Sequence, residues 1–299
     1  MKNRFFVFIL LGLLSFGSFA EQDDYFIMAE DSLHKMALNI IGPDQDEGRL
    51  ENNRTFFSFF KEVLDKQGSF AYPFDSLETV SLLTPPDKKF RMITWYVPLS
   101  GQRFQYFGFV QFPEKDDTPS ELIVLNDQTS QINRPGRQEL SADNWFGAYY
   151  YELIHNQYDG EDHYTFLGWK GDNPQTRKRV VEPFYFRKDQ PVFGRKVFDV
   201  GNNEFYRIVF EYSARVAMGL SYETHHVTVG GPRKKMIVFD RLAPTHESLR
   251  GHYQFYKPET NIFDGLLFEE GKWIYLEDVD ARAPETPTAR PRTPPSGNR

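Results

Sequence analysis

Four glycines, each at the centre of a segment rich in aromatic and branched residues, constrain the fold of this chain most tightly. The segments are YFGFVQF, FLGWKG, AMGLSY and FDGLLF, centred on Gly108, Gly168, Gly219 and Gly265. Aromatic and β-branched residues favour the pleated surface of a strand, whereas glycine adds chain entropy there and has no side chain to pack. A glycine at this place therefore predicts that a neighbouring sheet or a large aromatic side chain approaches the backbone closely.

The segments on either side of each glycine have the same texture. An aromatic-rich strand comes before each one (FRMITWYV, YYYELIHN, FYRIVFEY and HYQFY), and a third strand follows it (ELIVLND, KRVVEPF, KMIVFDR and KWIYLED). From about Val80 onward the pattern thus predicts a mainly β, antiparallel meander that contains four units of three strands. Such units are compatible with a propeller or with a sandwich of packed sheets, and strand alternation is similar in both.

A short helical part comes before the strands. Apolar residues recur at helical spacing over residues 26–41 and again over 49–66, and glycines follow the two runs at Gly42 and Gly68. We expect both apolar stripes to pack against a core. Residues 21–280 are predicted to form a single domain.

The first 20 residues have the pattern of a signal peptide. Lys2 and Arg4 precede an apolar run, and Ser18 and Ala20 place small residues before a cleavage point at Glu21. The run is shorter than the roughly 20 residues that span a bilayer, and no second run follows. The sequence therefore predicts an exported, periplasmic or secreted protein without a transmembrane segment in the mature chain.

Charge and cysteine content narrow the function classes. The chain has no cysteine, which excludes disulfides, a lipid anchor on cysteine and thiolate metal sites. Removing the two positive charges of residues 1–20 changes the net charge from −7 to −9, and residues 281–299 contribute four arginines and one glutamate, or +3. The body is therefore near −12, which disfavours nucleic acid as a partner. The Pro/Thr/Arg-rich tail over 281–299 is predicted to be disordered.

Acidic residues at the ends of the third strands are the candidates for catalysis. Common hydrolase motifs are incomplete: GLSYE lacks the last glycine of a nucleophile elbow, and HESLR lacks the second histidine of a zinc helix. Strand-end carboxylates could act as general acid and base on a glycan or another envelope polymer. Alternatively, they begin turns and stay in water. The four candidates are Asp127, Glu182, Asp240 and Glu277.

Aromatic and histidine side chains offer two further candidate sites. Trp145, Tyr149 and Trp169 provide flat rings that could stack on sugars, or they could fill the core, as large aromatics usually do. His155 and His163 flank the loop NQYDGED and could share a metal ion. Solvated loop histidines are the alternative, and we expect no cofactor.

Several segments resemble exported bacterial β-rich proteins of an uncharacterised family with no assigned activity. They are YTFLGWKGDN, RIVFEYSARVAMGLSY, KMIVFDRLAP and FDGLLFEEGKWIYLEDVDAR, and the similarity covers roughly residues 80–282. The resemblance implies export and a β-rich body, and it transfers no catalytic residue. The preferred interpretation is a soluble, non-catalytic protein that binds a protein or glycan partner of the cell envelope. The alternative is a hydrolase that acts on an envelope polymer through the strand-end carboxylates.

Overall fold

The computed structural model describes residues 13–42, 45–115, 120–171, 173–201, 205–228 and 230–281. Side chains are described from Asp24 onward. The structure confirms a mainly β fold with two helices near the N-terminus. The helices are α1 (Leu13–Ile41) and α2 (Asp46–Leu64).

The strands form three sheets in the described part of the chain. The first sheet is a meander in sequence order, made of β1 (Ser81–Leu83), β2 (Arg91–Leu99), β3 (Arg103–Gln111) and β4 (Leu122–Asn126). The central sheet has the order β5 (Leu140–Ser141), β9 (Gln190–Phe193), β8 (Thr176–Arg187), β7 (Glu161–Gly171) and β6 (Tyr149–Tyr158), and β11 (Ile208–Ser213) also pairs with β8. The third sheet has the order β10 (Phe198–Asp199), β15 (Lys272–Leu276), β14 (Tyr256–Glu269), β13 (Arg233–Pro244) and β12 (Leu220–His226).

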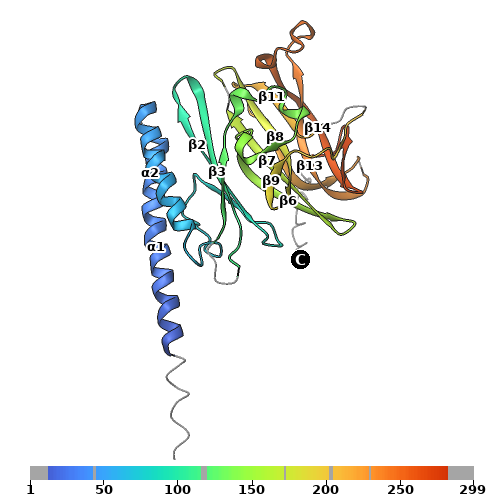
Figure 1. Ribbon diagram of the computed structural model, residues 1–299. Coiled ribbons are helices and arrows are strands. Elements are labelled where there is room, and N and C mark those ends of the chain that lie inside the picture. The colour runs from blue at the N-terminus through green and yellow to red at the C-terminus, as the bar shows by residue number, and fades with distance from the viewer. Residues whose placement is uncertain are drawn as a thin grey trace, which may run out of the picture.

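The two helices cover the outer face of the first sheet (Figure 1). Phe56 and Phe60 of α2 pack around Trp95 of β2, with ring centroids 5.3 and 6.2 Å from the Trp95 ring. The Trp95 indole N–H donates to the buried Asn53 side chain over 2.8 Å, so the helix also satisfies the one polar atom of that ring. Both predicted apolar stripes thus face a common core.

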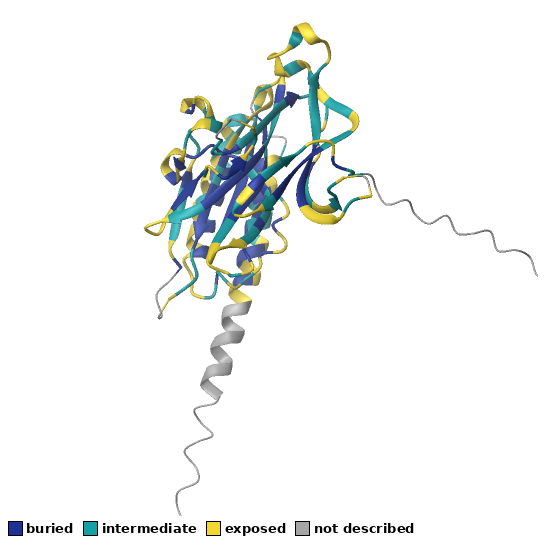
Figure 2. Cartoon of the chain, turned by 90° about the vertical axis from the view of Figure 1, so that its right-hand side faces the viewer, coloured by how far each residue is buried: buried dark blue, intermediate teal, exposed yellow. Residues whose placement is uncertain are grey.

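The sheets are stacked because successive strand residues point to opposite faces. Met92 of β2 faces away from the helices and shares a core with Phe166 of β7. The next residue of β7, Leu167, points the other way and packs with Ile237 and Trp273 of the third sheet. The order of layers is helices, first sheet, central sheet and third sheet, as the blue-to-red sequence of colours in Figure 1 shows. Figure 2 shows the buried residues running through the strands of these layers.

The four predicted units of three strands are therefore distributed over three sheets and not over four. β11, the first strand of the third unit, pairs with β8 of the second unit. The remaining strands of the third and fourth units join into one sheet through the β13–β14 pair. HYQFY, predicted as a strand, is mostly a 3-10 turn over Tyr253–Phe255. The sheets stack as a sandwich, and none of them closes on itself in the described residues.

Gly168 has the close contact that its position predicts. A Cβ atom built on this residue would lie 2.9 Å from Cδ1 of Tyr150, a distance that real Cβ atoms do not reach. Tyr150 is fully buried and stacks on Phe166, with ring centroids 4.8 Å apart. Gly219 differs, because it precedes β12 and a Cβ there would meet only Asp240 at an ordinary 3.4 Å.

The predicted terminal segments fall largely outside the described residues. Residues 1–12 of the predicted signal peptide and residues 282–299 of the predicted tail belong to this part. The helix predicted over 26–41 is the C-terminal part of α1, which begins at Leu13. Neither described helix combines the length and apolar character needed to cross a bilayer.

Candidate functional site

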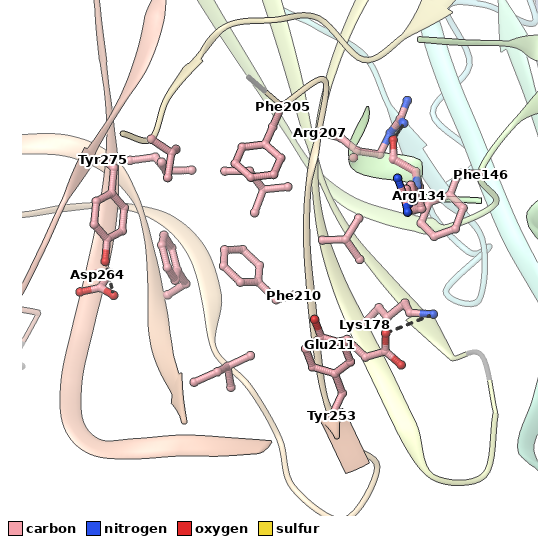
Figure 3. Close-up of a pocket in the computed structure, with 18 of the residues that line it drawn as sticks. Arg134, Phe146, Lys178, Phe205, Arg207, Phe210, Glu211, Tyr253, Asp264 and Tyr275 are labelled. Atoms are coloured by element: carbon pink, nitrogen blue, oxygen red, sulfur yellow. Dashed lines mark hydrogen bonds and ion pairs between the residues drawn. The ribbon is translucent and has the colours of Figure 1, made fainter. Parts of the chain in front are cut away.

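A cleft of about 1160 Å³ opens between the central and third sheets, on both sides of β11. Figure 3 shows how alternation along this strand divides the lining. Phe210 points toward Tyr275 and Asp264 of the third sheet, whereas Arg207 and Glu211 lie on the side of Lys178. The cleft is thus built around a strand that is hydrogen-bonded along one side, to β8.

Apolar side chains dominate the side of the cleft that faces the third sheet. We call this side the apolar lobe. Most of these residues are only partly buried, although they belong to the core between the two sheets. Phe210 and Phe239 meet across it, with ring centroids 4.6 Å apart. The lobe is lined by Val200, Phe205, Ile208, Phe210, Phe239, Leu242, Leu266 and Tyr275.

A hydrogen-bonded carboxylate closes one wall of the apolar lobe. Asp264 accepts from Arg241 Nε over 3.0 Å, from the Tyr275 hydroxyl over 2.8 Å and from the Asp278 amide over 3.0 Å. Burial opposes ionisation of Asp264, but these hydrogen bonds outweigh it and hold the carboxyl pKa below its usual value. Burial and the neighbouring carboxylate raise the pKa of Tyr275 to about 12, so this hydroxyl stays a donor near neutral pH.

The charges that line the cleft balance. Four basic residues (Arg134, Lys178, Arg207 and Arg241) face four acidic ones (Glu211, Asp240, Asp264 and Glu277), which gives a formal sum of zero. Lys178 Nζ lies 3.7 Å from Glu211. Arg134 is exposed, and within the described residues its side chain has no hydrogen-bond or ion-pair partner. Arg134 is therefore available to form an ion pair with an anionic group of a ligand.

Two of the four predicted catalytic acids have structural roles, and one of them, Glu182, is also shielded from solvent. Glu182 is fully buried and receives both of its contacts from Nε of Arg207, at 2.9 and 2.7 Å. Asp127 organises a turn, because it accepts from the backbone amides of Thr129 and Tyr106 over 3.0 and 3.2 Å. A strand-end position predicted exposure for both, and tertiary packing places Glu182 in the interior.

The other two predicted acids do line the cleft. Asp240 accepts from the Gly219 amide over 2.6 Å, and Glu277 lies 3.4 Å from Arg241 with its side chain 72% exposed. The structure therefore brings together two of the four acids and separates the other two from them.

The predicted aromatic residues divide in a similar way. Trp145 is fully buried, and its indole N–H donates to the Tyr150 hydroxyl over 3.0 Å, so it belongs to the core. Tyr149 and Trp169 are direct cross-strand partners on β6 and β7 and remain partly exposed. They line a hollow of about 480 Å³ together with Tyr96, Tyr151, Arg179 and the end of α1.

The two predicted metal-binding histidines point to opposite faces of the β6–β7 hairpin. His155 pairs with Tyr164 and faces the first sheet, where it meets Asp162 and Asp87. His163 pairs with Asn156 and packs against Phe268 of the third sheet, with ring centroids 5.2 Å apart. They therefore do not share a site.

Sequence reasoning missed the residues that come from separate parts of the chain. Arg134, Arg241 and Asp264 carried no motif, and only the fold brings them to one cleft. Asp162 was detectable, because the Asp-Gly turn at 159–160 sets the register of the hairpin and so the face on which each residue lies.

No known protein family, curated protein or solved structure matches this chain.

Proposed function

We propose that the protein is a non-catalytic binding protein, and that the cleft beside β11 takes an amphipathic ligand with an apolar chain. The observation that carries the proposal is the apolar lobe, where large apolar side chains remain partly open to solvent. Leaving such side chains exposed forgoes about 25 cal/mol for each Å² of apolar surface. A ligand chain that covered them would recover this free energy.

The volume and shape of the cleft support this class of ligand. Ligand sites typically have volumes of roughly 300–1,000 Å³, with mostly apolar walls and a few polar groups that orient the ligand. The cleft, at about 1160 Å³, is slightly larger than this range and has mostly apolar walls. Its balanced charge argues against a polyanion, whereas the unpaired Arg134 suits a single anionic head group such as a carboxylate or a phosphate.

A fluorescent long-chain fatty acid tests the proposal. We expect the tag-free chain to bind it saturably, with a dissociation constant in the micromolar range. Leu242→Asp places a charge in the apolar lobe and should weaken binding at least about tenfold, since burying an unpaired charge is costly. Leu38→Asp is the matched control, because Leu38 is 46% exposed on α1, far from the cleft lining.

Arg134→Gln distinguishes the contribution of the ligand's head group from that of its apolar chain. It should weaken binding of the fatty acid more than binding of the corresponding long-chain alcohol, which has no charge to pair. The proposal fails if the unmodified chain does not bind either compound, or if Leu242→Asp binds both as well as Leu38→Asp does.

A second candidate ligand is a glycan in the hollow that Tyr149 and Trp169 line. Aromatic rings beside the guanidinium of Arg179 offer both a stacking surface and hydrogen-bond donors. Titration with envelope glycan fragments would test it: Trp169→Ala should abolish a chemical shift or fluorescence change that Leu242→Asp leaves intact.

Hydrolysis of an envelope polymer through strand-end carboxylates stays a weaker alternative. Its support is that Asp240 and Glu277 line one cleft, although each already has a protein partner. Turnover of a polymer that Asp240→Asn and Glu277→Gln both abolish would favour this alternative over simple binding.

Export to the periplasm or beyond remains part of the proposal, and cell fractionation tests it.

A further inference from the structure

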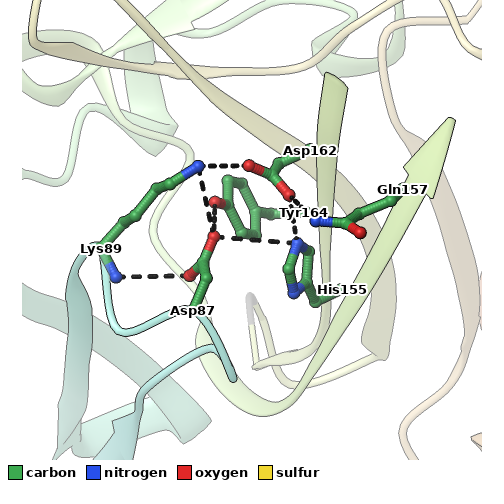
Figure 4. Close-up of polar contacts among 6 residues, drawn as sticks. All are labelled: Asp87, Lys89, His155, Gln157, Asp162 and Tyr164. Atoms are coloured by element: carbon green, nitrogen blue, oxygen red, sulfur yellow. Dashed lines mark hydrogen bonds and ion pairs between the residues drawn. The ribbon is translucent and has the colours of Figure 1, made fainter. Parts of the chain in front are cut away.

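The geometry points to a binding site for a divalent transition-metal ion, formed by Asp87, His155 and Asp162 between the first and central sheets. Figure 4 shows the three side chains converging from two parts of the chain. Asp87 lies in the loop between β1 and β2, and the other two come from opposite strands of the β6–β7 hairpin. The site is separate from the cleft beside β11.

The distances between the potential ligand atoms lie on both sides of the spacing that a metal centre requires. Nε2 of His155 lies 2.7 Å from Oδ1 of Asp162 and 3.8 Å from Oδ2 of Asp87, and one ligand atom from each residue lies within 4.8 Å of the others. With zinc–ligand bonds of about 2.0–2.1 Å, tetrahedral geometry places ligand atoms about 3.3 Å apart. Side-chain adjustments of about 1 Å therefore suffice to seat an ion.

The donor set selects the type of metal. One imidazole nitrogen and two carboxylate oxygens suit zinc and similar divalent transition ions, whereas calcium and magnesium prefer oxygen alone. Three protein ligands leave the remaining coordination positions to water. The ion would take the place of the proton in the contact between His155 and Asp162.

Neighbouring side chains already hold the ligands in place. The Tyr164 hydroxyl donates to Asp87 Oδ2 over 2.5 Å, and the Gln157 amide donates to Asp162 Oδ1 over 2.8 Å. The His155 ring stacks on Tyr164, with ring centroids 5.0 Å apart. Such outer contacts orient metal ligands and strengthen binding.

Lys89 occupies the position of an internal cation at this site. Its ammonium group contacts Asp162 and lies 3.5 Å from Asp87. The Lys89 side chain is 57% exposed, whereas the three ligand side chains are only 10–17% exposed. A long, exposed side chain can leave for solvent, so Lys89 competes with the metal without blocking the site.

Metal binding would fasten two layers of the fold together, because the ligands come from the first and the central sheet. The chain has no cysteine and so no disulfide that could do this. Zinc should therefore raise the melting temperature as well as bind.

Zinc titration of the tag-free, chelator-treated full chain, by calorimetry and by thermal unfolding, tests the proposal. We expect one zinc ion to bind and to raise the melting temperature, and calcium to do neither. Asp162→Asn and His155→Gln should each weaken zinc binding at least about tenfold. His163→Gln is the matched control on the same hairpin and should bind as the unmodified chain does.

Lys89→Met distinguishes a metal site from a purely structural ion-pair cluster. If the cluster is a metal site, this variant binds zinc at least about tenfold more tightly, because it removes the competing cation. Its melting temperature should fall without metal and recover with zinc. The proposal is overturned if Lys89→Met is destabilised and zinc neither binds it nor restores it, or if His163→Gln loses binding as fully as His155→Gln.

Discussion

Arg207 and Glu182 form an ion pair from which solvent is excluded, with Nε of the arginine 2.9 and 2.7 Å from the two carboxylate oxygens. Arg207 also donates to the backbone carbonyls of Gln138 and Phe193, each over 2.9 Å. The guanidinium therefore joins β8 to two neighbouring segments of the central layer. Glu182, a candidate for catalysis by its position in the sequence, is the counter-ion of a structural arginine.

Glu182→Gln should lower the free energy of unfolding by about 3–5 kcal/mol, because it leaves the Arg207 charge buried and uncompensated. Urea denaturation measures the change. Asp31→Asn is the control, since Asp31 pairs with Lys35 on the exposed face of α1 and surface pairs contribute at most about 1 kcal/mol. Equal losses for the two variants would refute the structural role.

Asp264→Asn should destabilise the chain by about 2 kcal/mol near pH 7, since it breaks a charge-assisted network at the cleft wall. The folded-state pKa of Asp264 is depressed, so its contribution is present above the unfolded pKa of about 3.9 and is lost as the pH falls through the folded value. The difference in the free energy of unfolding between Asp264→Asn and the unmodified chain should therefore become smaller below about pH 4. Urea midpoints at pH 7 and pH 3 measure it, and a gap that stays constant would contradict the assignment.

Gly168→Ala should cost about 1–3 kcal/mol of stability, because the added methyl group overlaps the ring of Tyr150. Tyr150 cannot yield easily, since it stacks on Phe166 and accepts from Trp145 over 3.0 Å. In Gly219→Ala the added methyl group makes only an ordinary 3.4 Å contact. This substitution should change the free energy of unfolding by no more than about 0.5 kcal/mol. Thermal unfolding compares the pair. Similar losses at both positions would mean that the glycines share a different role.

Asn53→Ala should destabilise the chain by about 1–3 kcal/mol, because it leaves the buried Trp95 indole N–H without an acceptor. Asn52→Ala makes the same change in helix propensity one residue earlier, where the side chain contacts Asn39 over a weak 3.4 Å. The difference between the two variants in chemical denaturation isolates the Trp95 contact. No difference would show that the helices are held to the first sheet by apolar packing alone.

Local patterns in the sequence were sufficient for much of this fold. The helical stripes and the strand texture predicted the two helices and the antiparallel strands, because each depends on residues close together in the chain. The close packing at Gly168 followed for the same reason. The separation of His155 from His163 onto opposite faces follows from the hairpin register, whereas Tyr149 pairs with Trp169 only because a β-bulge between Tyr150 and Glu152 shifts that register by one residue.

Long-range pairing was decided only in the tertiary structure. β11 reads as the first strand of a third unit, yet it pairs with β8, because a strand of this length can satisfy its hydrogen bonds at any compatible sheet edge. That pairing creates the cleft, and it brings Arg134 and Asp264 to one site from positions 130 residues apart. Asp87 and Asp162 likewise meet only when the first and central sheets stack.

The sequence by itself determined the elements: two amphipathic helices, strands rich in aromatic and branched residues, and a glycine at a point of close approach. It determined them because propensity and side-chain periodicity are local properties. The tertiary structure alone decided which faces meet, and so which carboxylates are buried, which line the cleft and which converge on His155. These outcomes depend on contacts between distant segments, whose geometry is set by the stacking of whole sheets.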